Sequence, residues 1–276
     1  MAAEGRGERL DQHLVRRGLF ATRSQAAAAL LAGEVEVEGA ERPRPGDRVR
    51  GEPAVRLRSG PRYASRGGRK LEAALERWPV PVAGAVCADL GSSTGGFTDC
   101  LLAHGARRVY AVDVGRGLLA WRLRQDARVV VREGTNARHL RADDLPERVE
   151  VVTADLAFIS LTKVAPAIGD LLRAGGHAVC LVKPQFEAGP ARVGRRGVVA
   201  DPADWRRAVT AVAASLAAVG VGARAVMASP ILGPEGNAEF LLWAEAGAGH
   251  GLATAELEEA VAAALALRAA RAGGST

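Results

Sequence analysis

Lysine is scarce in this chain, so the positions that keep a lysine are the first candidates for chemistry. Of the 37 basic side chains only Lys70, Lys163 and Lys183 are lysines, and the others are arginines. An arginine guanidinium stays charged in any protein setting, whereas a lysine amine can gain or lose a proton as its surroundings change. Lys70 ends the loop-like segment 65–70, and Lys183 ends an apolar run. We therefore consider these two lysines as proton-handling groups and assign no chemistry to Lys163, although the scarcity could also be a compositional accident.

The overall composition is that of a globular protein with a polyanionic partner. An apolar content of 48% and a charged content of 25% are ordinary for a folded domain. A length of 276 residues suffices for one large domain, or for a small domain and a large one. The net charge of +6 favours an acidic partner such as a nucleic acid.

Cysteine, histidine and hydropathy patterns argue against disulfides, a metal site and a membrane span. Three cysteines cannot all pair, and the five histidines lack metal-ligand spacing. The N-terminus is polar and charged, unlike a signal peptide, and the longest uncharged stretch, 208–223, is shorter than a membrane span. We therefore expect a cytoplasmic protein that binds neither metal nor membrane. The oligomeric state does not follow from the sequence.

From residue 85 onward, apolar runs of strand length alternate with helix-like segments. We expect strands at 86–90, 109–112, 129–132, 149–154, 178–182, 223–228 and 239–244, and helices at 96–104, 117–124, 160–173 and 203–219. This alternation predicts a Rossmann-like α/β fold, with a mostly parallel sheet and helices on both faces. Ligands of such sheets bind beyond the C-terminal ends of the strands. We place this domain at 85–248 and a C-terminal helix and tail at 249–276.

A glycine-rich loop follows the first of these strands. It is not a P-loop, because Phe97 stands where the phosphate-binding lysine must be, and Ser93 replaces the second glycine of a dinucleotide loop. S-adenosylmethionine carries no phosphate and would need neither feature. Asp113, at the end of the second strand, would then bind its ribose hydroxyls. The other expected cofactor-binding residues are Asp89, Gly91, Ser93, Thr94, Gly95, Gly96, Phe97 and Asp155. The alternative is a purely structural glycine turn.

The residues after the fourth strand narrow the class of methyl acceptor. Methylation of a base amino group usually requires Asn-Pro-Pro-aromatic there, but this chain has Asp155-Leu156-Ala157-Phe158. Methylation of a pyrimidine carbon uses a cysteine nucleophile, and no cysteine here is suitably placed. The remaining candidates for catalysis are Lys70, Asp155, Lys183 and Glu239. Three of them flank expected strands, so they could converge on one site.

Residues 1–60 differ from the rest and are expected to form a small α+β domain. Their motifs are Arg-Leu-Asp at 9–11, Leu-Val-Arg-Arg-Gly-Leu at 14–19, Thr-Arg-Ser-Gln-Ala at 22–26 and Gly-x-Val-x-Val-x-Gly at 33–39. This order resembles the S4 RNA-binding domain. The resemblance implies binding to structured RNA, with Arg9, Arg16, Arg17 and Arg23 on phosphates. The alternative is a merely solvated basic face.

Between the two domains, residues 61–84 are expected to form a basic linker and lead-in segment that carries Lys70. Its arginines Arg62, Arg66 and Arg69 are candidates for contact with RNA phosphates. The alternative is a solvated hinge without a ligand.

The order of Lys70, Asp155, Lys183 and Glu239 resembles ribose 2′-O-methyltransferases of the FtsJ type. The motifs are closer still to the TlyA family, some of whose members carry the name haemolysin. They stand at 65–68 (Ser-Arg-Gly-Gly), 93–98 (Ser-Thr-Gly-Gly-Phe-Thr), 135–138 (Thr-Asn-Ala-Arg), 158–161 (Phe-Ile-Ser-Leu), 181–187 (Leu-Val-Lys-Pro-Gln-Phe-Glu), 229–230 (Ser-Pro) and 236–237 (Gly-Asn). Two departures are Ala157, where the family pattern has Ser, and Tyr63, where some members have Trp.

The resemblance implies S-adenosylmethionine-dependent 2′-O-methylation of cytidine ribose in 16S and 23S ribosomal RNA, and it adds Asn136 to the cofactor site. Because a ribose 2′-hydroxyl is a poor nucleophile, we expect Lys183 to contact it, while Lys70 and the two carboxylates set the protonation of Lys183. Two other functions remain open at this point. One is a membrane-active haemolysin, and the other is a catalytically inactive factor that binds ribosomal RNA during ribosome assembly.

Overall fold

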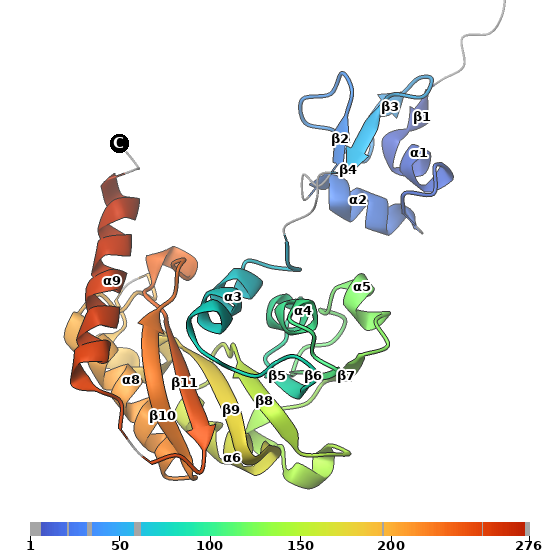
Figure 1. The fold of residues 1–276 in the computed structure, drawn as a ribbon. Helices are drawn as coiled ribbons and strands as arrows, with labels where there is room; N and C mark the ends of the chain where they lie inside the picture. The colour runs from blue at the N-terminus through green and yellow to red at the C-terminus, as the bar shows by residue number, and fades with distance from the viewer. Residues whose placement is uncertain are drawn as a thin grey trace, which may run out of the picture. The chain divides into compact units, whose positions relative to one another are not determined.

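The computed structural model describes residues 7–20, 22–31, 35–57, 62–194, 196–249 and 251–273. The chain separates into two compact units, residues 1–62 and 63–276 (Figure 1). Each unit is described by itself.

The N-terminal unit is small and mixes short helices with short strands. Its elements are β1 (Glu8–Arg9), α1 (Leu10–Arg16), α2 (Arg23–Leu31), β2 (Val35–Val37), β3 (Arg48–Val49) and β4 (Val55–Leu57). β1 pairs with β3 and β2 with β4, both antiparallel. Its core is built from Leu10, Leu14, Ala26, Ala29, Leu30, Val35 and Val37. β2 lies within the Gly-x-Val-x-Val-x-Gly motif, and its two valines belong to this core.

The larger unit is built on a seven-stranded sheet. Its strands are β5 (Val86–Leu90), β6 (Arg108–Asp113), β7 (Val129–Glu133), β8 (Val149–Ala154), β9 (Leu172–Val182), β10 (Val221–Ala228) and β11 (Phe240–Ala246). They lie in the order β10-β11-β9-β8-β5-β6-β7. β11 is antiparallel to both of its neighbours, and the other pairs are parallel. The expected Rossmann-like, mostly parallel sheet is thus confirmed.

Helices cover both faces of this sheet. α3 (Gly67–Arg77), α4 (Gly96–Ala103) and α5 (Trp121–Arg124) contribute to one apolar core, and α6 (Ala165–Leu171), α8 (Pro202–Ala217) and α9 (Thr254–Gly273) contribute to the other. Along β5, Val86, Ala88 and Leu90 enter one core and Cys87 the other, as the alternation of a strand requires. The order of strands reverses at β5, between β6 and β8, so the ends of β5 and β8 form the switch point where ligands of such sheets bind.

Two expected helices differ from the structure. The helix expected at 160–173 is a 3-10 turn at Leu161–Lys163 followed by α6, because Pro166 favours a new helical start and β9 already begins at Leu172. The helix expected at 117–124 is reduced to α5, since Gly117 adopts a left-handed φ of 71° that is incompatible with a helix interior. A further short helix, α7 (Pro184–Glu187), follows β9.

The segment 61–84 is more ordered than the basic linker that we expected. Gly67–Arg77 forms α3, whose Leu71 and Ala74 are fully buried. Two glycines at its start concealed the helix, yet Gly68 is required there because a Cβ would collide with the ring of Tyr63, itself 1% exposed. The C-terminal segment also packs on the sheet, with Leu257 and Val261 of α9 in the core. Both segments are therefore structural parts of the larger unit.

Candidate active site

The loop that joins β5 to α4 adopts a sharply folded backbone. Gly91, Ser93 and Gly95 have φ values of 83°, 49° and 98°, in the left-handed region that favours glycine. A Cβ at Gly91 would lie 2.6 Å from the carbonyl oxygen of Asp155, and one at Gly95 would collide with Leu123. These glycines therefore allow the loop to pack closely against the ends of β8 and α5.

Two aspartates at the ends of strands make hydrogen bonds around this loop. Asp89 is fully buried at the end of β5 and accepts hydrogen bonds from the hydroxyls of Thr98 (2.7 Å) and Thr153 (3.0 Å). Burial raises its pKa to about 6. Asp113, at the end of β6, accepts from the backbone N–H groups of Ser93 (2.8 Å) and Gly115 (2.7 Å). Asp89 thus connects α4 to β8, and Asp113 fixes the backbone of the loop on which a ligand would rest.

The loop forms one wall of a cavity of about 440 Å³ at the switch point. All four expected catalytic residues, Lys70, Asp155, Lys183 and Glu239, line it. They come from α3 and from the ends of β8, β9 and β11, which lie side by side in the larger unit (Figure 1). Of the expected cofactor-binding residues, Gly91, Ser93, Thr94, Gly96, Phe97 and Asp155 line the cavity, whereas Asp89, Gly95, Asp113 and Asn136 do not.

The four residues form two ion pairs with different surroundings. Lys70 Nζ lies 2.5 Å from Glu239 Oε2, and both side chains are almost completely buried. Lys183 Nζ lies 2.6 Å from Asp155 Oδ1, with 13% and 22% of the two side chains exposed. The second oxygen of Glu239 is buried and has no hydrogen-bond partner in the described part of the chain. The cavity therefore combines one buried charge pair with one pair that a substrate can reach.

A half-buried carboxylate connects the two loops that carry the accessible pair. Glu187 in α7 accepts hydrogen bonds from the Ser160 hydroxyl (2.5 Å) and from the backbone N–H of Leu161 (2.8 Å). Burial raises the pKa of Glu187. These bonds join the segment after β8 to the segment after β9. They therefore limit the movement of Asp155 and Lys183 relative to each other.

Two aromatic rings lie beside the accessible pair. The ring of Phe186 has its centre 5.9 Å from Lys183 Nζ and 5.4 Å from the ring of Phe158. Phe158 is 93% exposed and has a φ of 62°, which is rare for a bulky residue. An exposed aromatic held by such a backbone is a candidate for contact with a ligand. From the sequence, Phe158 is named only as part of a family motif, and no role is predicted for it.

The remaining expected site residue, Asn136, makes a local contact. Its side-chain oxygen accepts a hydrogen bond from the backbone N–H of Arg138 (3.0 Å) and caps the 3-10 turn at Ala137–His139. Asn136 follows β7, the strand that pairs with β6, and β6 ends at Asp113.

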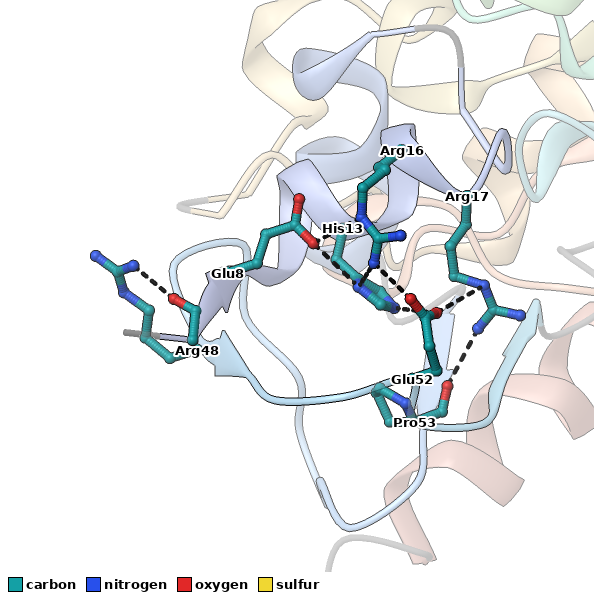
Figure 2. A network of polar contacts seen from close by, with 8 residues as sticks. Glu8, His13, Arg16, Arg17, Arg48, Glu52 and Pro53 are labelled. Atoms are coloured by element: carbon teal, nitrogen blue, oxygen red, sulfur yellow. Dashed lines mark hydrogen bonds and ion pairs between the residues drawn. The ribbon is translucent and has the colours of Figure 1, made fainter. Parts of the chain in front are cut away.

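The arginines expected to bind RNA from the N-terminal unit are engaged by polar groups of that unit. Arg16 lies between two carboxylates, 3.0 Å from Glu8 and 2.7 Å from Glu52, above the buried ring of His13 (Figure 2). Arg17 donates to the carbonyl oxygen of Pro53 at 3.1 Å (Figure 2).

Arg9 and Arg23 share the carboxylate of Asp11, at 2.8 and 3.3 Å. The hydrogen bonds from Arg9 lower the pKa of Asp11 to about 2. The ion pairs of Arg16 could not be predicted from the sequence, because its partners lie 8 and 36 residues away.

The linker arginines differ from those of the N-terminal unit. Arg66 and Arg69 are exposed, and in the described part of the chain neither forms an ion pair. Arg66 lines the cavity together with Ser65 and Gly67. Arg62, also exposed, belongs to the N-terminal unit.

Comparison with known proteins identifies the family. A family model described as FtsJ-like methyltransferase matches residues 63–246. This range contains the seven-stranded sheet and all four expected catalytic residues. The chain belongs to this family. Within the FtsJ-like methyltransferases it groups with proteins that carry the name TlyA.

Curated relatives cover nearly the whole chain. The 16S/23S rRNA (cytidine-2′-O)-methyltransferase TlyA of Mycobacterium tuberculosis strain H37Rv is 46% identical over 93% of this chain and 96% of its own length. Hemolysin A of Brachyspira hyodysenteriae is 36% identical over 84% of this chain and 98% of its own length. A solved structure described as a hemolysin from Streptococcus thermophilus has a TM-score of 0.73 and 37% identity, and covers 97% of this chain and 99% of that one.

Some relatives thus carry a name that suggests membrane damage. Among the residues that the structure describes, none of the helices combines the length and the hydropathy that crossing a bilayer requires.

Proposed function

We propose that this protein transfers a methyl group from S-adenosylmethionine to the 2′-hydroxyl of cytidine ribose in ribosomal RNA. The single observation that carries this proposal is the convergence of Lys70, Asp155, Lys183 and Glu239 on one cavity beside the β5–α4 loop. The relatives named as TlyA methyltransferases supply the substrate class. Such a substrate places the activity in the cytoplasm, with ribosomal RNA or a ribosomal subunit as the partner.

The lining of the cavity fits a ligand without phosphate groups. The part of the wall formed by Ser92, Ser93 and Thr94 presents hydroxyls and backbone polar groups, and Asp155 presents a carboxylate oxygen. Asp113 stands next to this wall, at the end of the neighbouring strand. These groups suit the hydroxyls and the amine of S-adenosylmethionine. When bound, this cofactor would supply an electrophilic methyl group on a sulfonium.

Lys183 is the group that we assign to the 2′-hydroxyl. Its amine is accessible from the cavity, and Asp155 orients it at 2.6 Å. Once the ammonium has passed a proton to Asp155, the neutral amine accepts a hydrogen bond from the hydroxyl, aligns its oxygen and receives its proton as the new bond forms.

The buried pair of Lys70 and Glu239 acts on the hydroxyl indirectly, through its effect on Lys183. Two opposite charges in a poorly solvated place interact strongly, so each holds the other in position. Their fields set the electrostatic environment of Lys183, and the unpartnered oxygen of Glu239 remains as an acceptor within the cavity.

The target base has a candidate contact outside the cavity. Phe158 offers nearly its whole ring to solvent beside Lys183 and Phe186. Enzymes that act on a nucleotide within structured RNA must expose it, and aromatic faces stack readily with exposed bases. Recognition of the surrounding RNA is assigned to the N-terminal unit, by its resemblance to the S4 domain, and to Arg66 and Arg69.

The experiment that tests this proposal maps 2′-O-methyl groups on ribosomal RNA from cells with and without the protein. Purified protein and S-adenosylmethionine should restore the missing group, on a cytidine, in subunits from the deficient cells. Identical maps from the two kinds of cell, together with no methyl transfer in vitro, would refute the proposal.

A further inference from the structure

A second cavity of about 470 Å³ adjoins the active site, and the reaction described above does not use it. Its wall is formed by the segment between β10 and β11 and by the last turns of α9. Arg66, Gly233 and Pro234 line both cavities, so the two cavities adjoin at these three residues. Whatever occupies the second cavity therefore lies next to the group that reacts in the first.

The lining of the second cavity combines an apolar floor with charged groups. Pro230, Ile231, Leu232 and Leu267 supply the apolar surface. Arg66 and Arg271 supply two guanidinium groups, and Glu235 supplies one carboxylate. A flat apolar group together with an anion matches this lining, and a nucleotide carries both. Arginine binds phosphate oxygens readily, and a carboxylate can accept from a base amino group or a ribose hydroxyl.

The segment that carries Glu235 is held rigidly in an unusual conformation. Glu235 has a φ of 55° and Gly236 a φ of 87°. The side chain of Asn237, 4% exposed, donates to the carbonyl oxygens of Gly197 (3.0 Å) and Pro234 (3.2 Å) and accepts from the N–H of Val199 (3.1 Å). A non-glycine residue persists in such a backbone only where its surroundings fix it, and such residues concentrate at ligand sites.

We propose that this second cavity binds the nucleotide next to the methylated one in the substrate RNA. The proposal rests on the proposed function and adds to it a specificity-determining site. The base lies against Leu232 and Leu267, and Arg66 and Arg271 bind the phosphates that link it to the target. The position next to the active site favours this occupant, because an RNA chain whose target nucleotide enters the first cavity must continue past the three shared residues.

The test compares substitutions at two leucines of α9. Leu267→Trp fills the cavity, whereas Leu265→Trp adds the same bulk two residues earlier, at an exposed position outside it. The substrate is ribosomal subunits from cells that lack the protein. We expect Leu267→Trp to lower kcat/KM for methyl transfer roughly tenfold, within the range for loss of one stacked base. Affinity for S-adenosylmethionine and the melting temperature should match those of Leu265→Trp.

A second pair of variants tests the phosphate contact. Arg271→Gln should reduce the slope of log affinity for the subunits against log salt by about one, the effect of losing one phosphate contact. Arg173→Gln is the matched control. Arg173 stands at the start of β9, and so at the opposite edge of the sheet, where it pairs with Glu150.

The outcomes separate the two proposals. If the wild-type protein methylates the subunits but the two tryptophan variants have equal kcat/KM, the RNA does not use the second cavity. If the affinity of Leu267→Trp for S-adenosylmethionine fell by the same factor as its kcat/KM, the cavity would belong to the cofactor site. That result would also overturn the inference. Should Leu267→Trp fail to fold, an unchanged salt slope in Arg271→Gln would refute it instead. Absence of wild-type activity would count against the proposed function.

Discussion

At the scale of single residues, the two cavity lysines share a charge but differ in what their surroundings allow. Lys70 is buried and paired with a buried carboxylate, so it has no room for a larger group. Lys183 is partly accessible and adjoins an aromatic ring. Lys163 lies exposed in a 3-10 turn and lines neither cavity, which makes it a natural control.

We expect Lys183→Arg to lower the rate of methyl transfer by about 10²-fold or more, the effect of a positioned acid–base group. Arginine keeps the charge but cannot release a proton and occupies more space. Lys70→Arg should also impair turnover, and Lys163→Arg should behave as wild type. Single-turnover methyl transfer to ribosomal RNA measures all three. Equal rates would show that the scarcity of lysine is a compositional accident.

Asp89 should make the stability of the protein depend on pH. Burial raises its pKa from 3.8 to about 6, so the folded state binds a proton more tightly than the unfolded state. This contribution is fully present below pH 4 and is lost as the pH rises through 6. Relative to Asp89→Asn, which keeps partners for both threonine hydroxyls, the wild type should lose about 3 kcal/mol over this interval. Urea denaturation between pH 4 and pH 8 measures the difference, and a constant difference would contradict the assignment.

At the scale of elements, the site depends on how the ends of strands hold the loops that follow them. Asp113 at the end of β6 accepts two backbone hydrogen bonds, one from the β5–α4 loop and one from its own loop. Glu187 in α7 joins the loops after β8 and β9 in a similar way. Two of the four proposed catalytic residues, Asp155 and Lys183, therefore lie on short segments that the half-buried carboxylate of Glu187 holds together.

Removal of the Asp113 carboxylate should weaken cofactor binding for two reasons. It deletes the expected partner of the ribose hydroxyls, and it releases the backbone of Ser93 and Gly115. We expect Asp113→Ala to lower affinity for S-adenosylmethionine by about 1.5–3 kcal/mol, the usual effect of a charged hydrogen bond. Titration calorimetry gives the value, with the exposed Asp143→Ala as the control. Unchanged affinity in a folded Asp113→Ala protein would remove Asp113 from the cofactor site.

At the scale of the whole molecule, the division into two units predicts separable activities. Every residue that lines the two cavities lies in 63–276, and so do the two larger apolar cores. The N-terminal unit has a core of its own, and its expected RNA-binding arginines are held by Glu8, Asp11, Glu52 and Pro53. The proposed chemistry therefore lies in residues 63–276, and the role that we propose for the N-terminal unit is recognition of RNA.

Deletion of residues 1–60 should therefore leave affinity for S-adenosylmethionine unchanged. Binding to ribosomal RNA should weaken, and its dependence on salt should become shallower because fewer phosphates are neutralised. Filter binding over a range of salt concentrations, with calorimetry for the cofactor, measures both effects. A shortened protein that binds and methylates ribosomal RNA as well as the full chain would show that the S4-like motifs have no role in recognition.

The sequence alone determined the features that depend on local pattern. The apolar runs of β5 and β8 were predicted with their observed ends, because a strand buried on both faces needs continuous apolar residues. The polar residues that follow such strands marked Asp155 and Lys183 as site candidates, since the ends of parallel strands share one edge. The resemblance to a known family added the substrate class.

Only the tertiary structure decided which groups meet. Lys70 and Glu239 are 169 residues apart, and their pairing depends on how α3 crosses the end of β11. α3 itself escaped prediction because its glycine-rich start opposes a helix until Tyr63 packs against it. The second cavity likewise exists only because the end of α9 reaches Arg66 and the β10–β11 segment. Contacts between distant segments depend on the packing of whole elements, and no local pattern of residues encodes that geometry.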